Sequence, residues 1–225
     1  MNSAELKKVK KACSITVKIF RALIKELGKR AFKTELDVYD FLKQRTKENG
    51  CKLAFKPVVA MGRNAAEIHH KASNSRLRKG FLVVDFGVKY KGYCGDCTRT
   101  FYLYGKPSKF ERKIYELVLL AQETALMHVR AGAYAADIDL IARAILWDYY
   151  RNFVHGTGHG IGKKIHQSPG LSPTSKRILK KGQAITIEPG LYFKNKFGVR
   201  IEDTIVVGEK GARILTKISK KLLVV

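Results

Sequence analysis

Four carboxylate residues occupy strand-like runs at positions where they can form a metal site: Asp85, Asp96, Glu188 and Glu202. The runs are FLVVDFGVK (81–89), GYCGDCTRTFYLYG (92–105), AITIEPGLYF (184–193) and GVRIEDTIVV (198–207). A turn over residues 89–92 sets Asp85 directly across from Asp96. A turn around Asn195 sets Glu188 opposite Glu202, and each hairpin then carries a pair of facing carboxylates.

Facing carboxylates need compensation. Like charges directly opposite each other destabilise a sheet unless a cation or a shared proton is present. Two such pairs, in corresponding places of two similar halves, indicate a polyvalent cation, and four oxygen ligands can hold two metal ions that share carboxylates. The alternative of surface charges on half-exposed strands fits poorly. Neighbours such as Val83, Phe86, Ile187 and Ile201 are apolar, and unpaired charges are rarely buried.

Three histidines, His155, His159 and His166, lie in the glycine-rich segment HGTGHGIGKKIH. Glycines let the backbone bend tightly and approach a ligand closely. An imidazole beside the carboxylates completes a mixed nitrogen and oxygen donor set, which suits manganese, cobalt, iron or zinc. His159 is the best-placed of the three. The segment lacks the Lys-Ser/Thr of a phosphate-binding loop and follows no βαβ strand, which argues against phosphate binding.

Two further histidines, His69 and His70, fall in a loop after the predicted strand of residues 54–62. Their pattern alone leaves two interpretations open, solvated loop residues or functional ones. The C-x-x-C pair in YCGDC, Cys94 and Cys97, also suggests chemistry, but residues three apart on an extended strand have Cα atoms roughly 10 Å apart and point to opposite faces. We therefore expect packing thiols, with Cys94 open to oxidation because it shares a face with Asp96.

The elements that position these residues alternate in two similar rounds. Helices are predicted over residues 3–27, 34–49, 108–128 and 136–150, with Thr34 as an N-cap and Ser108 with Glu111 as a capping box. Each helix pair precedes two or more of the strand-like runs. Helices followed by hairpins, twice, predict an α+β domain made of two similar halves. No linker of Pro, Ser or Gly divides the chain.

The composition bounds the protein class. The 225 residues are 45% hydrophobic, enough for a core, and no stretch approaches the roughly 20 apolar residues of a membrane span. Four cysteines in irregular positions favour free thiols in the cytoplasm. The 44 Lys and Arg against 19 Asp and Glu give a net charge of +25. Because these basic residues form no dominant block, we expect non-specific polyanion contact and no specific nucleic-acid partner.

The motifs together resemble the pita-bread metallopeptidases, the group of methionine aminopeptidase, aminopeptidase P and prolidase. The resemblance runs from about residue 10 to the C-terminus. DFGVKYKGYCGDCTRTF, HGTGHGIGKKIHQSP, TIEPGLYF and GVRIEDT match four motifs of the family. It implies the pita-bread (creatinase/aminopeptidase) fold, two pseudo-symmetric halves of helices packed on a curved antiparallel sheet.

The resemblance also implies roles for individual residues. It makes Asp85, Asp96, His159, Glu188 and Glu202 the ligands of two divalent metal ions, with Asp96 and Glu202 bridging them. His69, His155 and His166 fall on family positions that contact the substrate or stabilise the tetrahedral intermediate. Two departures from the family pattern, Gly95 and Gln167, affect no expected ligand.

Substrate class follows from the same resemblance. His155, the phrase EPGLY and Arg200 resemble the proline-peptide enzymes, which implies cleavage of Xaa-Pro bonds in peptides, of aminopeptidase P or prolidase type; methionine aminopeptidase is the runner-up. The chain is expected to be a single catalytic domain, 1–225, without the family's N-terminal domain, and either monomeric or homodimeric.

The implied mechanism is attack by a hydroxide that bridges the two metals. His69 or His166 donates to the oxyanion, and Glu188 shuttles a proton to the leaving amine. The competing class is a non-catalytic protein of the same fold that binds RNA or ribosomes. Such a protein has no need of all five ligand residues, and this sequence has them.

Overall fold

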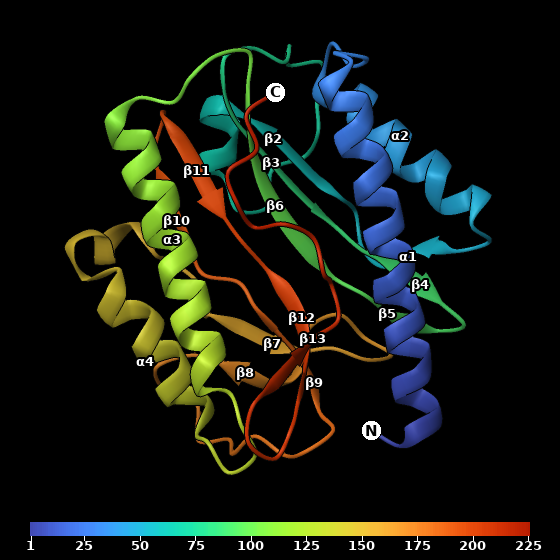
Figure 1. Ribbon diagram of the computed structural model, residues 1–225, viewed down its shortest axis with the longest axis vertical. Helices are drawn as coiled ribbons and strands as arrows, with labels where there is room; N and C mark the ends of the chain where they lie inside the picture. The colour runs from blue at the N-terminus through green and yellow to red at the C-terminus, as the bar shows by residue number, and fades with distance from the viewer.

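The computed structural model describes residues 1–225, which form two helix pairs flanking antiparallel strands (Figure 1). The helices are α1 (Ser3–Gly28), α2 (Glu35–Glu48), α3 (Lys109–His128) and α4 (Ala135–Ile145), with two 3₁₀ helices, η1 (Gly62–Ala66) and η2 (Trp147–Asn152). The strands of the first half are β1 (Lys52–Leu53), β2 (Val58–Met61), β3 (Gly80–Phe86), β4 (Val88–Tyr90), β5 (Tyr93–Cys94) and β6 (Cys97–Leu103). Those of the second half are β7 (Gly158–Gly160), β8 (Gln167–Leu171), β9 (Ala184–Ile187), β10 (Gly190–Phe193), β11 (Phe197–Arg200), β12 (Asp203–Val207) and β13 (Ala212–Ile214).

The helices begin where local side-chain chemistry satisfies free backbone N–H groups. Three of the four helices start with a reciprocal capping box: Asn2 with Glu5, Thr34 with Asp37, and Ser108 with Glu111. The predicted helices of residues 3–27, 34–49 and 108–128 are therefore confirmed. The helix predicted to end at residue 150 ends at Ile145, where η2 continues the chain. None of these helices combines the length and the apolar character needed to cross a membrane.

Each half has its own sheets and core. The first half has the sheets β2-β3-β6 and β1-β4-β5 beneath α1 and α2, and the second has β13-β12-β9-β7-β8 with the hairpin β10-β11 beneath α3 and α4. One hydrophobic cluster includes Phe20, Leu42 and Phe86, and the other includes Ile114, Ile138 and Ile185. The α+β pita-bread prediction is consistent with this arrangement, in which helices and strands mix and no barrel closes.

The second predicted register is correct on both sides of the site. Gly190 pairs with Arg200 in the hairpin, and Ile187 pairs with Asp203 in the next ladder, as a turn around Asn195 requires. The ladder is interrupted between them because two N–H groups bond elsewhere. The Glu188 N–H donates to the Thr157 carbonyl at 2.7 Å and the Glu202 N–H to the Thr98 carbonyl at 3.1 Å.

The first predicted register is wrong by two residues. Asp85 pairs with Thr98 and not with Asp96, which lies in the connection between β5 and β6. The cause is the turn: Lys91 and Gly92 have φ of 46° and 84°, so they form a two-residue loop between Tyr90 and Tyr93. A shift of two residues keeps the same face, so Asp85 and Asp96 still point to one side.

Candidate metal centre and substrate cavity

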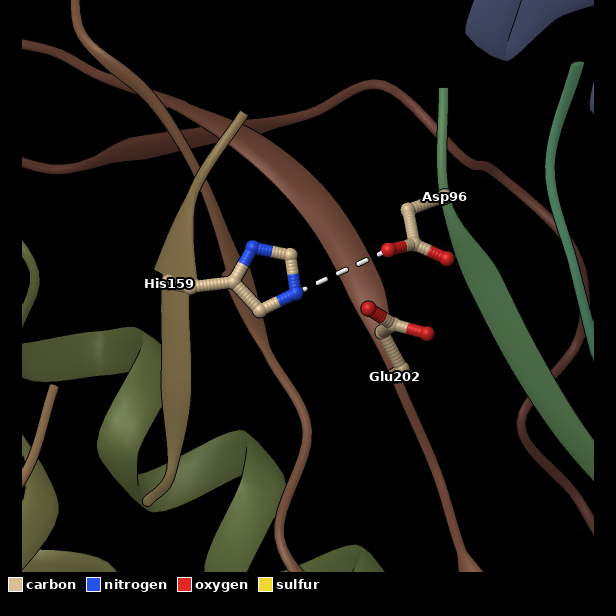
Figure 2. Close-up of side chains that lie close together, drawn as sticks. All are labelled: Asp96, His159 and Glu202. Carbon is tan, nitrogen blue, oxygen red and sulfur yellow. Dashed lines mark ion pairs between the residues drawn. The ribbon is translucent and has the colours of Figure 1, made fainter. Parts of the chain in front are cut away.

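Three side chains from distant parts of the chain converge between the two halves. Asp96, His159 and Glu202 each place one ligand atom so that these atoms lie within 4.8 Å of one another (Figure 2). Asp96 follows β5, His159 is the middle residue of β7, and Glu202 lies between β11 and β12. The glycine-rich segment around His159 contributes β7 to the second sheet.

The His159 ring is oriented for ligation. Its Nδ1 lies 3.1 Å from the Gly160 carbonyl oxygen, which only accepts, so Nδ1 carries the hydrogen. Its Nε2 then faces two carboxylates, Glu188 Oε1 at 3.2 Å and Asp96 Oδ2 at 3.7 Å. Fixing one imidazole nitrogen on a carbonyl so that the other points to a metal is the usual arrangement for a histidine ligand.

Each neighbouring carboxylate is held on one oxygen by a donor of the protein. Arg200 Nη2 donates to Asp85 Oδ2 at 2.8 Å, and Thr98 Oγ1 donates to Glu202 Oε2 at 2.8 Å. Thr186 Oγ1 lies 2.9 Å from Glu188 Oε1. These contacts fix the orientation of the carboxylates and leave their other oxygens free to bind a ligand.

Three buried oxygens have no hydrogen-bond partner: Asp85 Oδ1, Asp96 Oδ1 and Glu202 Oε1. Buried polar atoms without a partner are rare, and each costs about 1–3 kcal/mol or more when the group is charged. Three such atoms in one place have the arrangement expected of cation ligands. The donors therefore fit a site for divalent metal ions, and the side chains of Asp85 and Glu188 lie beside it.

The charge balance of the site points the same way. Burial, and then the charges of Asp85 and Glu188, raises the pKa of Asp96 well above its ordinary value, and burial followed by Asp96 does the same for Glu202. Burial also acts to raise the pKa of Glu188, but the hydrogen bond and charge of His159 outweigh it and bring that pKa down to about 2. The carboxylates of the centre thus carry more negative charge than the side chains of Arg200 and His159 neutralise.

A cavity of about 450 Å³ opens beside these residues. It is lined by Asp85, Asp96, His159, Glu188 and Arg200 on the metal side, and by Leu36, Tyr39, Phe55, Val58 and Ile68 on the apolar side. His69 and His166 both line it, and the His166 ring lies 4.5 Å from that of His159. A cavity of this size, with an apolar wall facing a few polar groups, has the character of a small-molecule site.

A tyrosine that the sequence reasoning missed links the remaining predicted residues. Tyr192 Oη lies 2.8 Å from His155 Nε2 and accepts a hydrogen bond from Arg200 Nη1 at 2.8 Å. His155 does not line the cavity. Its hydrogen bond to Tyr192 connects it through Arg200 to Asp85. The predicted hairpin register could have identified Tyr192, because this residue pairs with Gly198, which lies two residues from Arg200 on the same face of the hairpin.

The four cysteines are free, as expected, but Cys94 does not face the metal centre. The strand breaks after Cys94, and its Sγ points to the Lys163 carbonyl 3.8 Å away, in a cluster with Val9 and Cys13 of α1. The expectation that Cys94 is exposed to oxidation is therefore wrong. Burial raises its pKa, and its thiol is correspondingly unreactive.

Comparisons with known proteins identify the family of the chain. Residues 7–209 match the model of the family described as metallopeptidase family M24. The Xaa-Pro dipeptidase of Pyrococcus furiosus is 42% identical over 225 residues, which cover 97% of this chain and 63% of that protein. The Xaa-Pro dipeptidase of Pyrococcus horikoshii is 39% identical, again covering 97% and 63%. The chain thus spans about 63% of the length of these curated relatives.

Solved structures match over the entire chain. A prolidase from Thermococcus sibiricus superposes with a TM-score of 0.95 at 41% identity, covering 100% of this chain and 62% of that one. An X-Pro aminopeptidase from Thermotoga maritima gives a TM-score of 0.94 at 34% identity, covering 100% and 64%. These matches confirm the pita-bread fold, and the chain belongs to metallopeptidase family M24.

Proposed function

We propose that the chain is the catalytic domain of a metallopeptidase that hydrolyses Xaa-Pro peptide bonds, with two divalent ions as cofactors. The observation that carries the proposal is the set of three buried, unpartnered carboxylate oxygens beside His159 Nε2. The likeness to proteins named Xaa-Pro dipeptidase, prolidase and X-Pro aminopeptidase supports the substrate class. Residues 1–225 then act as one catalytic domain.

The ligands of the two ions are Asp85, Asp96, His159, Glu188 and Glu202. When bound, the ions supply Lewis-acid polarisation of the scissile carbonyl and a water whose pKa is lowered towards neutrality. Mixed imidazole and carboxylate donors accept manganese, cobalt, iron or zinc. Asp85, Asp96 and Glu202 would each offer the ions a buried oxygen that has no protein donor.

The protein groups around the ligands bind and orient the peptide. The apolar wall of the cavity, with Leu36, Tyr39 and Phe55, takes the side chain or the proline ring. His69 and His166 line the same cavity and donate hydrogen bonds to the developing oxyanion. Burial and the nearby His159 lower the pKa of His166, so its ring is neutral at neutral pH and offers a single N–H.

Glu188 would accept a proton from the attacking water and pass it to the leaving amine. Its Oε1 lies 3.2 Å from His159 Nε2, and its side chain lines the cavity, within reach of a bound peptide. His155, Tyr192 and Arg200 hold Asp85 from behind the cavity. Arg200 has its Nε, Nη1 and Nη2 all bonded within the protein, which makes it a support of the ligand as well as a cavity residue.

The test is hydrolysis by the purified chain with manganese or cobalt. Xaa-Pro dipeptides, Xaa-Pro-Yaa tripeptides and Met-Ala-type peptides separate dipeptidase, aminopeptidase P and methionine aminopeptidase activity. Chelator, Asp96→Ala and Glu202→Ala should each abolish cleavage. A variant that kept full metal-dependent activity would overturn the ligand assignment. An inactive wild-type chain that binds RNA tightly in a salt-resistant manner would favour a non-catalytic binding protein instead.

A further inference from the structure

One buried carboxylate outside the metal centre, that of Glu35, holds the far wall of the cavity. Glu35, the first residue of α2, is fully buried and receives five hydrogen bonds. Its Oε1 accepts from the Met61 N–H at 2.7 Å and from Asn64 Nδ2 at 2.9 Å. Its Oε2 accepts from the Ser73 N–H at 3.1 Å, from Ser73 Oγ at 2.9 Å and from His70 Nε2 at 2.9 Å.

These bonds tie one loop to one helix. Met61, Asn64, His70 and Ser73 all belong to residues 61–73, the stretch that starts at the end of β2 and includes η1. The backbone adds to the connection, because the Glu35 N–H donates to the Ser75 carbonyl and the Leu36 N–H to the Ser73 carbonyl, both at 3.1 Å. The loop of residues 62–75 is thus fixed onto the N-terminus of α2 at several points.

The two segments joined by Glu35 are the ones that face the metal ligands across the cavity. From α2 come Leu36 and Tyr39, and from the loop come Ile68, His69, His70, Lys71 and Ala72. His69 itself is exposed and makes no hydrogen bond through its ring to the rest of the chain, so its position depends on the backbone that carries it. The adjacent residue, His70, is 11% exposed and bonded to Glu35.

We propose that Glu35 and His70 form a positioning pair that holds His69 in place for the reaction. The inference rests on the proposed peptidase function, because it concerns the placement of a residue assigned there to the oxyanion. Glu35 does not touch the cavity, and His70 acts through its Nε2–H bond to Glu35. Such outer hydrogen bonds keep a functional side chain within the narrow range of geometry that catalysis needs.

The decisive experiment is a double-mutant cycle with Glu35→Gln and His69→Ala in the manganese-loaded chain. Glutamine keeps the size of Glu35 but replaces one acceptor oxygen by an NH₂ group. This group would face N–H and O–H donors of the loop and could not accept their hydrogen bonds. Glu35→Gln alone should lower kcat/KM for an Xaa-Pro peptide about tenfold, mostly through kcat. In the His69→Ala background it should lower kcat/KM by less than about twofold, because the residue it positions is gone.

A second series uses His70, whose removal leaves Glu35 with four of its five hydrogen bonds. His70→Ala should lower kcat, and His70→Gln, which can donate from Nε2 to Glu35, should restore much of it. Glu67→Gln is the matched control: Glu67 lies on the same loop, 3.4 Å from His70 Nδ1, but its side chain is 73% exposed. This control should stay within about twofold of wild type.

Hydrogen exchange gives a readout apart from activity. Glu35→Gln should speed exchange of the Met61 and Ser73 amides, which donate to the carboxylate, while the amides of β9 and β12 keep their protection. Equal effects of Glu35→Gln with and without His69, or no difference between His70→Ala and His70→Gln, would overturn the positioning role. A wild-type chain that cleaves no peptide would refute the proposed function, whereas an active chain with additive effects would refute this inference alone.

Discussion

Replacing Glu202 by glutamine should make the metal-free protein more stable and remove its stabilisation by metal. Glu202 is 1% exposed, its Oε2 accepts from Thr98 Oγ1, and its Oε1 has no partner. Glutamine has the same shape, and its oxygen can keep the Thr98 hydrogen bond. Its NH₂ group then takes the place of the unpartnered oxygen and can donate to Asp96.

The magnitude follows from the distance between the two carboxylates. The ligand atoms of Asp96 and Glu202 lie within 4.8 Å of each other. At an effective dielectric constant of about 20, two unit charges at that distance repel by roughly 3.5 kcal/mol. Because partial protonation relieves part of this repulsion, Glu202→Gln should raise the free energy of unfolding of the metal-free chain by about 1–3 kcal/mol.

The assay is chemical denaturation at pH 8, with chelator and with excess manganese. For wild type, manganese at 100 times its dissociation constant adds about 2.7 kcal/mol to stability. For Glu202→Gln the manganese effect should fall to a small fraction of that value. Glu209→Gln serves as the surface control, since Glu209 is 66% exposed and pairs with Lys181, and it should change neither quantity by more than about 0.5 kcal/mol.

Two results would refute the reasoning. If Glu202→Gln destabilised the chelated protein, the unpartnered oxygen would be satisfied in some other way and the repulsion argument would fail. If the variant kept the full manganese stabilisation, Glu202 would not be a ligand.

Three further predictions concern pH, thiols and packing. Burial and Asp96 raise the pKa of Glu202 above its ordinary value of 4.5. Between pH 4.5 and the raised pKa the unfolded chain releases this proton and the folded chain keeps it, so metal-free wild type loses stability as pH rises. The stability difference between wild type and Glu202→Gln, measured by denaturation, should therefore grow over that range. Ellman's reagent should label at most about one thiol in the native chain, the half-buried Cys51, and four after unfolding; rapid labelling of more would contradict the burial of the other three. Gly95→Ser should destabilise the chain by about 1–3 kcal/mol in thermal or chemical unfolding, because a Cβ there would lie 2.8 Å from the Cys13 backbone nitrogen in α1, and an unchanged stability would show that α1 can move aside.

Sequence patterns were sufficient where the chemistry is local. Capping residues such as Thr34 and Ser108 fix helix starts within one turn, and the structure has both helices as predicted. The carboxylates were found through alternation along strands, which depends only on a period of two. This is why the wrong pairing of Asp85 with Asp96 still placed both side chains on the correct face.

Long-range contacts could not be read from the sequence. The Thr98 carbonyl accepts the Glu202 N–H from the other half, and the Thr157 carbonyl accepts the Glu188 N–H within the second half; strand propensity predicts neither contact. The same holds for Glu35, which sequence shows only as the acidic first residue of a helix. Its partners, Met61 to Ser73, are 26 to 38 residues away.

The interrupted ladder explains why the metal ligands lie where they do. At Pro189 the second hairpin loses a donor, and the neighbouring N–H groups of Glu188 and Glu202 turn to Thr157 and Thr98. Both glutamates are thereby held by the strands that also carry His159 and follow Asp96. A continuous ladder would bond the glutamates only to each other's strand, so the break is what joins carboxylates of one hairpin to ligands from both halves.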